Sequence, residues 1–141
     1  MKETMDNRKK PTDKLRKPYR YSRNPKSGYA VKGRVWVEKD GELFLGWGRI
    51  QLLENIDRLG SISAAAREMN LTYRNAWLWV ESMNRLSEEP LVESITGGRG
   101  GGHARLTEAA RRAIKYYREL HDGLQSYIKD AVYPGENGSS R

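Results

Sequence analysis

Residues 61–107, SISAAAREMNLTYRNAWLWVESMNRLSEEPLVESITGGRGGGHARLT, contain the most telling pattern of this chain. A short Ala-rich helical pattern comes first, and a second helical pattern follows after a tight junction at Asn70 and Leu71. A strand, a glycine-rich loop and another strand complete the segment. This order predicts two crossed helices followed by a β-hairpin.

The two helical patterns suit a close crossing. The alanines at 64–66 keep the first helix thin, and the second helix has an apolar stripe made of Ala76, Val80, Met83 and Leu86. We expect Ser63 to cap a helix over 64–69, Asn70 to end it, and Thr72 to cap a helix over about 73–86. With the hairpin, the predicted fold class is α+β, mainly α: a winged helix-turn-helix over residues 29–106.

The first turn of the second helix carries side chains suited to reading DNA. The apolar stripe leaves Thr72, Tyr73, Arg74 and Asn75 free to project outwards. Arginine can bind guanine and asparagine can bind adenine through two hydrogen bonds each, and the hydroxyls suit phosphates. Trp77, one turn beyond Tyr73, either touches a sugar or thymine methyl at the groove edge or packs between helices. Trp79 is expected in the core or as a cover for the N-terminal hairpin.

The loop at 97–102 is the second DNA-binding candidate. Its glycines let backbone N–H groups approach a phosphate, and cationic side chains flank them. The loop lacks the Lys-Ser/Thr of a P-loop, and its glycine spacing does not match the dinucleotide-binding fingerprint. We therefore interpret it as a wing, with these expected DNA-contacting residues: Gly98, Arg99, Gly100, His103 and Arg105.

Two further elements are expected before this segment. Residues 31–45 alternate apolar and other side chains around a turn at 39–41, which predicts a hairpin. Residues 47–59 predict a helix that ends at Gly60. Its expected buried positions are Ile50, Leu53, Ile56 and Leu59.

A long helix is predicted from Glu108 to about Asp130, capped by Thr107, within a segment at 107–133. Apolar and aromatic residues follow a 3,4 spacing through three heptads at Ala110, Ala113, Tyr117, Leu120, Leu124, Tyr127 and Ala131. We expect self-association as a homodimer; the alternative is a helix packed on its own domain. The expected interface comprises Ala113, Tyr117, Leu120, Leu124 and Tyr127. Residues 134–141 are expected to be a flexible tail.

The positive charge is unevenly distributed. The formal net charge is +8, and residues 1–28 hold ten Lys and Arg against three Asp and Glu. This segment has few aliphatic residues and is expected to be a disordered arm when free. Either it is a solubilising tail, or it follows phosphates or enters a minor groove. Double-stranded DNA is the partner that the arm and the loop at 97–102 favour.

Composition excludes several classes of protein. The chain has no cysteine and two histidines, so disulfides and thiolate metal sites are excluded, and no metal or cofactor is expected. No catalytic set of residues emerges, so we expect no enzyme activity. No apolar run approaches a membrane span, and no signal region is present, so a cytoplasmic, nucleoid-associated protein without a membrane partner is expected.

The segment GRIQLLENIDRLGSISAAAREMNLTYRNAWLWVESMNRLSEEPLVESITGGRGGGHARLTEAARRAI resembles the N-terminal domain of ModE-type molybdate-responsive regulators, which are similar in turn to the LysR family. The matching motifs are GSIS-A-A, T-Y-R-x-A-W, N-x-L-S and TGGRGGGxxxLT. The resemblance implies a prokaryotic transcription factor that binds DNA as a dimer, with the DNA-reading role at 72–75 and a wing at 98–100.

Full-length members of that family continue into β-barrel domains that bind molybdate or tungstate. This sequence ends at Arg141, so a small-molecule effector is not expected within this chain. The leading interpretation is a sequence-specific regulator, with a link to molybdenum or tungsten metabolism. The alternatives are a low-specificity architectural DNA-binding protein and a protein–protein adaptor that uses the winged domain as a docking face.

Overall fold

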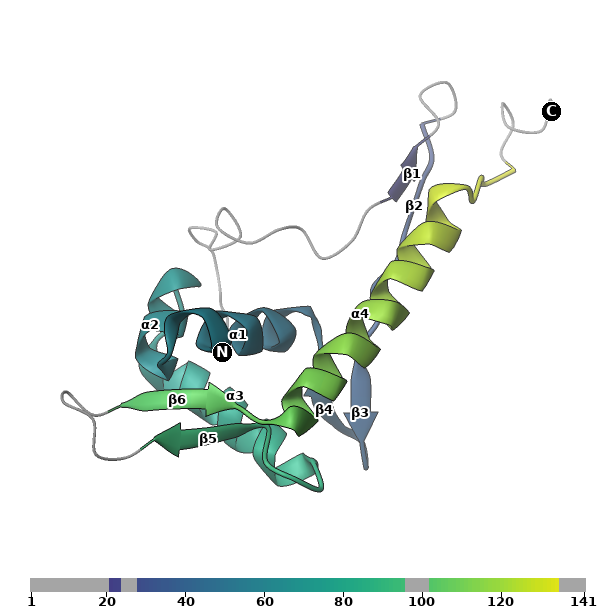
Figure 1. Cartoon of the computed structure of the whole chain (residues 1–141). Helices are drawn as coiled ribbons and strands as arrows, with labels where there is room; N and C mark the ends of the chain where they lie inside the picture. The colour runs from purple at the N-terminus through teal and green to yellow at the C-terminus, as the bar shows by residue number, and fades with distance from the viewer. Residues whose placement is uncertain (1–20, 24–27, 96–101, 135–141) are drawn as a thin grey trace.

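The computed structural model describes residues 21–23, 28–95 and 102–134 (Figure 1). Within these ranges, six strands form three two-stranded antiparallel sheets, β1–β2, β3–β4 and β5–β6. In chain order the elements are β1 (Tyr21–Arg23), β2 (Ala30–Lys32), β3 (Val37–Lys39), β4 (Glu42–Leu45), α1 (Trp47–Leu59), α2 (Ile62–Glu68), α3 (Tyr73–Leu86), β5 (Val92–Ile95), β6 (His103–Leu106) and α4 (Glu108–Lys129). The predicted α+β winged helix with a long C-terminal helix is confirmed.

Helix α1 lies at the centre of the core. It spans the predicted residues and ends at Gly60, whose φ of +83° is the left-handed conformation that glycine adopts without strain. The prediction of its buried face was wrong at two positions. Leu52 is fully buried, while Leu59 is exposed. The reason is that α2 packs on one side of α1 and β6 and α4 pack on another, so that the buried face is wider than one stripe.

Helix α2 begins two residues earlier than expected. Ser61, not Ser63, is its cap: the backbone is extended there, and Ser61 Oγ accepts a hydrogen bond of 3.0 Å from the Ala64 N–H. The Ser63 hydroxyl instead accepts a bond from Arg67 on the exposed surface. Ala65 and Ala66 are buried, in keeping with a thin helix that a neighbour can approach closely.

The N-terminal strands form two hairpins. The turn between β3 and β4 is formed by Asp40 and Gly41, both with positive φ, as the predicted turn requires. The hairpin is shorter than residues 31–45, because β2 pairs with β1 instead. The expected disorder of residues 1–28 is therefore wrong for Tyr21–Arg23. The rest of the arm up to residue 27 lies outside the described residues.

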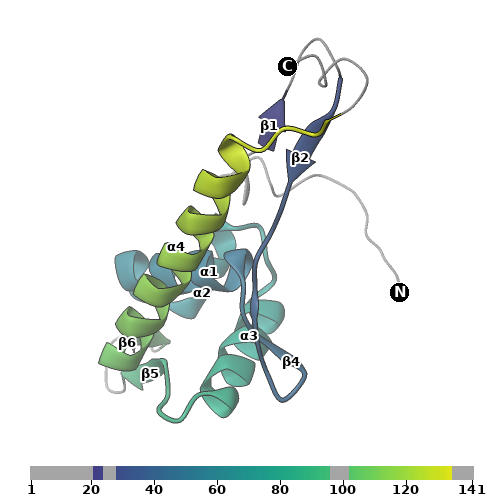
Figure 2. The ribbon, with the colours of Figure 1, turned by 90° about the vertical axis from the view of Figure 1, so that its right-hand side faces the viewer.

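Helix α4 runs from the core outwards, and its C-terminal half projects beyond the body with β1 and β2 alongside it (Figures 1 and 2). Thr107 caps it as predicted, accepting a bond from the Ala110 N–H. The chain between β2 and β3 is hydrogen-bonded to it, since Gln125 donates to the Gly33 carbonyl and Tyr117 donates to the Val35 carbonyl at 2.8 Å.

The buried face of α4 differs from the predicted stripe. The buried residues are Ala110, Tyr117, His121, Gln125 and Ile128. This set follows the 3.6-residue repeat of a straight helix, from which a 3.5-residue heptad stripe drifts by about 20° per heptad. Tyr117 is only 1% exposed, so its expected place in a dimer interface is wrong: its ring is part of the core of its own chain. Leu120 and Tyr127 remain on the exposed side.

Within the described ranges, no helix is both long enough and apolar enough to cross a lipid bilayer.

The Tyr117 hydroxyl gives a prediction about stability. Tyr117→Phe should lower the free energy of unfolding by about 1 kcal/mol, because the partly buried Val35 carbonyl loses its donor. Burial also raises the pKa of Tyr117, so the hydroxyl's contribution is complete below the unfolded pKa and is lost as pH rises through the higher folded value. Urea denaturation at neutral and alkaline pH measures both effects. Tyr116→Phe, at an exposed ring on the same helix, is the control and should leave the free energy of unfolding unchanged.

Candidate nucleic-acid interface

The candidate interface is built on α3, which is amphipathic. Ala76, Val80, Met83 and Leu86 are its buried residues, as the sequence predicts, and the first three belong to the hydrophobic core cluster. Thr72 caps the helix by accepting a hydrogen bond of 3.0 Å from the Asn75 N–H. The buried face and the cap together fix which way the first turn of α3 points.

The first turn of α3 is exposed and available for binding. Thr72, Tyr73, Arg74 and Asn75 are all exposed, with 55% of Tyr73 accessible. The Arg74 and Asn75 side chains have no hydrogen-bond or ion-pair partner among the described residues. The first turn carries no acidic residue, so the positive end of the helix dipole is unopposed there. A phosphate or a base edge can approach this turn.

Trp77 and Leu78 extend this surface along α3. Trp77 is 41% exposed, so the alternative in which it packs between helices is wrong for this chain. Leu78 is equally exposed, and our sequence reasoning missed it. The sequence could have indicated this residue, because Leu78 follows Arg74 by four positions and residues four apart lie on one face of a helix.

The second element is the hairpin β5–β6, in register from Val92 with Leu106 to Ile95 with His103. His103 and Arg105 are exposed on it as expected. Arg105 Nε forms an ion pair of 3.3 Å with Glu93, which offsets part of its charge. The remaining expected wing residues, Gly98, Arg99 and Gly100, lie outside the described residues.

The hairpin is attached to the start of α2. The Ala104 N–H donates to the Gly60 carbonyl at 2.9 Å, and Ser61 and His103 form an antiparallel bridge. Ser61 therefore has two roles, since it caps α2 and pairs with β6. This pairing sets the hairpin beside the two crossed helices, which is the arrangement of a winged helix-turn-helix.

Comparison with known proteins agrees with this geometry. Residues 47–111 match the family described as bacterial regulatory helix-turn-helix protein, lysR family. The chain is 46% identical to the molybdenum-pterin-binding protein MopA of Rhodobacter capsulatus over 88 aligned residues. These residues make up 62% of this chain and 33% of that protein. It is 43% identical over 95 residues to the molybdenum transport protein ModE of Azotobacter vinelandii, 67% of this chain and 35% of that protein.

A third relative is the DNA-binding transcriptional dual regulator ModE of Escherichia coli, 46% identical over 76 residues, 54% of this chain and 29% of that protein. The matched part of this chain is thus similar to the helix-turn-helix of the lysR family and to ModE proteins. It spans about a third of the length of the relatives it matches.

One residue that holds the candidate interface together was not predicted as functional. Asn84, near the end of α3, accepts hydrogen bonds from the N–H groups of Leu91 and Val92 at 2.8 and 3.1 Å and donates to the Val92 carbonyl at 3.0 Å. It thus ties the last turn of α3 to the first residues of β5. Its sequence signal was an asparagine beside the apolar stripe of a helix, where a polar side chain needs a partner.

Thr107 completes this connection. Its hydroxyl donates to the Pro90 carbonyl at 2.7 Å, and its N–H donates to the Leu91 carbonyl at 3.0 Å. The same oxygen caps α4. The chain between α3 and β5 is therefore bonded both to α3 and to the start of α4.

The described part of the chain has no group of three or more His, Asp or Glu side chains placed to hold a metal ion.

Removal of the Asn84 amide should destabilise the domain. We expect Asn84→Ala to lower the free energy of unfolding by about 2 kcal/mol, because two N–H groups and a carbonyl lose their partner. Asn84→Asp keeps an acceptor for both N–H groups and should lose less. Chemical denaturation of the three proteins measures the difference. Equal stability of Asn84→Ala and the parent chain would contradict the assigned role.

Proposed function

We propose that this chain is a sequence-specific DNA-binding transcriptional regulator that acts on genes of molybdenum metabolism. The observation that carries the proposal is the exposed first turn of α3, with Arg74 and Asn75 unpartnered among the described residues, beside a hairpin fixed to α2. Arg74 reads a guanine and Asn75 an adenine in the major groove, while Thr72 and Tyr73 contact phosphates. Trp77 and Leu78 lie against sugars or thymine methyls.

The hairpin acts as a wing on the same DNA. His103 and Arg105 lie at its exposed edge, and the glycine-rich segment between β5 and β6 supplies Gly98, Arg99 and Gly100. We propose that this loop contacts phosphates beside the groove that α3 enters. The paired Arg105 contributes less than an unpaired cation, because Glu93 lies beside it.

The link to molybdenum rests on the relatives. The relatives include a molybdenum-pterin-binding protein, a molybdenum transport protein and a DNA-binding transcriptional dual regulator. The matched region of this chain holds the helix-turn-helix, so DNA recognition is the part of their activity for which its geometry gives direct support. Control by an oxyanion is not part of the proposal.

We propose further that the regulator binds as a homodimer through the projecting half of α4. This half has exposed apolar and aromatic side chains that a second copy would cover, including Leu120 and Tyr127, the latter 78% exposed. Leu124 is half-buried at the edge of the same surface, and Ala113 is half-buried nearer the core. A two-fold dimer would place two α3 helices in successive major grooves, about 34 Å apart.

Base reading by Arg74 can be tested directly. Arg74→Ala should weaken binding to the preferred duplex by about 1–3 kcal/mol and relax the preference at one base position. Selection of sequences from a random duplex pool, followed by titrations at fixed salt, measures both. Arg85→Ala is a matched control on the same helix, since Arg85 is paired with Glu42 at the far end of α3. An unchanged ratio of preferred to random binding in Arg74→Ala would contradict the proposal.

The dimer can be tested on the exposed side of α4. The double variant Leu120→Asp, Tyr127→Asp should shift the chain from dimer to monomer, because it places two charges in an apolar contact. Sedimentation velocity measures the shift. Ser126→Asp adds a charge at an exposed polar position nearby and serves as the control. A parent chain that stays monomeric at the concentrations at which it binds DNA would rule the dimer out.

A further inference from the structure

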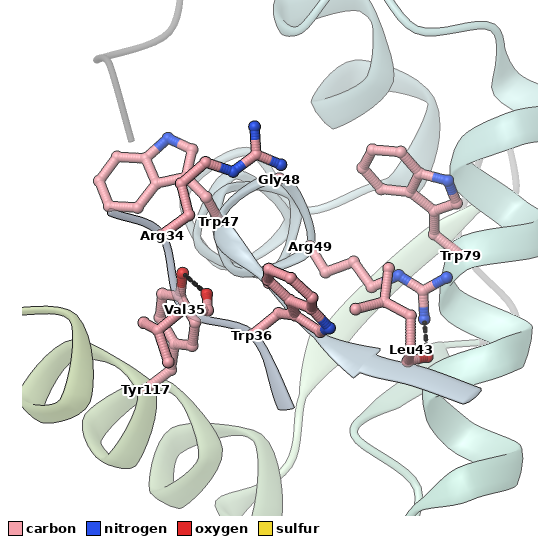
Figure 3. Close-up of a pocket in the computed structure, with 10 residues that line it drawn as sticks. Arg34, Val35, Trp36, Leu43, Trp47, Gly48, Arg49, Trp79 and Tyr117 are labelled. Carbon is pink, nitrogen blue, oxygen red and sulfur yellow. Dashed lines mark hydrogen bonds between the residues drawn. The ribbon is translucent and has the colours of Figure 1, made fainter. Parts of the chain in front are cut away.

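A pocket of about 480 Å³ opens where α1 begins, well within the size of small-molecule sites (Figure 3). Its walls come from four parts of the chain that are far apart in sequence. Trp36 and Leu43 belong to the segment around β3 and β4, Trp47 to α1, Trp79 to α3 and Tyr117 to α4. In Figure 3, Trp79 enters from one side of α1 and Tyr117 from the other.

The walls of the pocket are rich in aromatic rings. Three of the chain's four tryptophans line it, at positions 36, 47 and 79. Trp36 is 53% exposed, although it stands on the wall of an otherwise apolar hollow. Gly48 allows Trp79 to lie close to α1: a Cβ there would stand 3.3 Å from the indole ring. The Trp47 ring already contacts the His121 ring, at 4.6 Å between centroids, and the Arg118 guanidinium, at 5.0 Å, so Trp36 and Trp79 offer the faces on which a planar ring could stack.

The charges that line the pocket are all positive. Arg34 and Arg49 are its charged residues, and no carboxylate is among the lining residues. Arg34 has no hydrogen-bond or ion-pair partner within the described ranges. The pocket also receives the N-terminal end of α1, which has no side-chain cap and no acidic residue in its first turn.

Arg49 is held in place and only partly satisfied. Its Nη1 donates to the Leu43 carbonyl at 3.0 Å and to Ser82 Oγ at 3.1 Å, and its guanidinium lies 6.0 Å from the centre of the Trp79 ring. Its Nε and Nη2 donors have no partner among the described residues. Burial lowers the pKa of Arg49, which means that its charge has lost part of its solvation. A bound anion would compensate for the solvation that the Arg49 charge has lost.

We propose that this pocket binds a small aromatic anion, with a planar ring against Trp36 and Trp79 and its carboxylate against Arg34 and Arg49. A guanidinium binds a carboxylate through paired hydrogen bonds, and the indole rings offer apolar faces to the ring of the ligand. The proposal goes beyond DNA recognition and departs from the expectation that no small-molecule effector binds within this chain.

The position of the pocket argues against DNA as the occupant. Trp79 lies six residues beyond Tyr73, about 9 Å along α3 from the turn that faces DNA. A duplex backbone presents no aromatic ring that could lie against Trp36 and Trp79. The charges alone fit a phosphate, whereas the charges and rings together fit an aromatic acid.

The test uses the full chain and 2-naphthoate as the probe in isothermal titration calorimetry. We expect one saturable site per chain with a dissociation constant of about 1 mM or lower. Two comparison compounds separate the two parts of the recognition: 2-naphthamide keeps the rings without the charge, and cyclohexanecarboxylate keeps the charge without the aromatic ring. Each should bind at least about tenfold more weakly.

Variants of exposed residues then locate the site. Arg34→Met and Trp36→Leu should each weaken 2-naphthoate binding by about tenfold or more, and Arg34→Lys should restore part of the loss. Lys129→Met removes an exposed cation at the far end of α4 and should have no effect. Circular dichroism checks that each variant folds. If a variant does not fold, the relative affinities of the three compounds for the parent chain still test the proposal.

Several outcomes would overturn the proposal. They are the absence of saturable binding at about 10 mM probe, equal binding of the amide, and unchanged binding to Arg34→Met. Binding that disappears as the protein concentration rises and dimers form would also overturn it, because a second copy would then occupy the pocket.

Discussion

The structure depends on the burial of one face of α3. Ala65 and Ala66 give α2 a low profile, and Ala76, at 0% exposure, fills the close crossing between the two helices. A residue in a helix is rotated by about 100° from the one before it, so Arg74 lies about 200° from Ala76, on the opposite side. The packing that holds α3 in the core therefore forces Arg74 outwards. A larger residue at 76 would separate the helices and change where that arginine points.

The wing is held by the helix-turn-helix at two separate points. At one end, Ala104 bonds to Gly60 beside the Ser61–His103 bridge, and at the other end Asn84 holds the first residues of β5 against α3. Two points of attachment fix both the position and the direction of a hairpin, whereas one would let it swing. The first turn of α3 and the edge of the wing thus keep a constant separation. Rigid spacing of this kind favours recognition of a defined groove geometry over adaptable contact with many surfaces.

Local signals in the sequence predicted the bounds of the helices well, but they predicted less well which elements pack against each helix. The bounds of α1 and α3 follow from apolar spacing and from Gly60 and Thr72, all of which act within a few residues. The sequence did not distinguish Ser61 from Ser63 as the N-terminal cap of α2. The choice depends on a strand distant in sequence, because pairing with β6 holds Ser61 in an extended conformation. The pairing of β1 with β2 and the burial of Leu52 depend on α4 and β6 in the same way. Propensity and spacing carry no information about such contacts.

Tyr117 shows why the pocket could not be predicted from the sequence. A 3,4 spacing placed this ring on a dimer stripe, but the straight helix turns it inwards, where its hydroxyl binds the Val35 carbonyl. That bond holds the chain beside α4, so that Arg34 and Trp36, the neighbours of Val35, stand at the start of α1. Three elements that are separate in sequence are thereby joined around one hollow: α4 through Tyr117, α3 through Trp79 and α1 through Trp47. Whatever fills that hollow contacts α3, which carries the proposed DNA-reading turn, and α4, which carries the proposed dimer surface, because side chains of both helices form its walls.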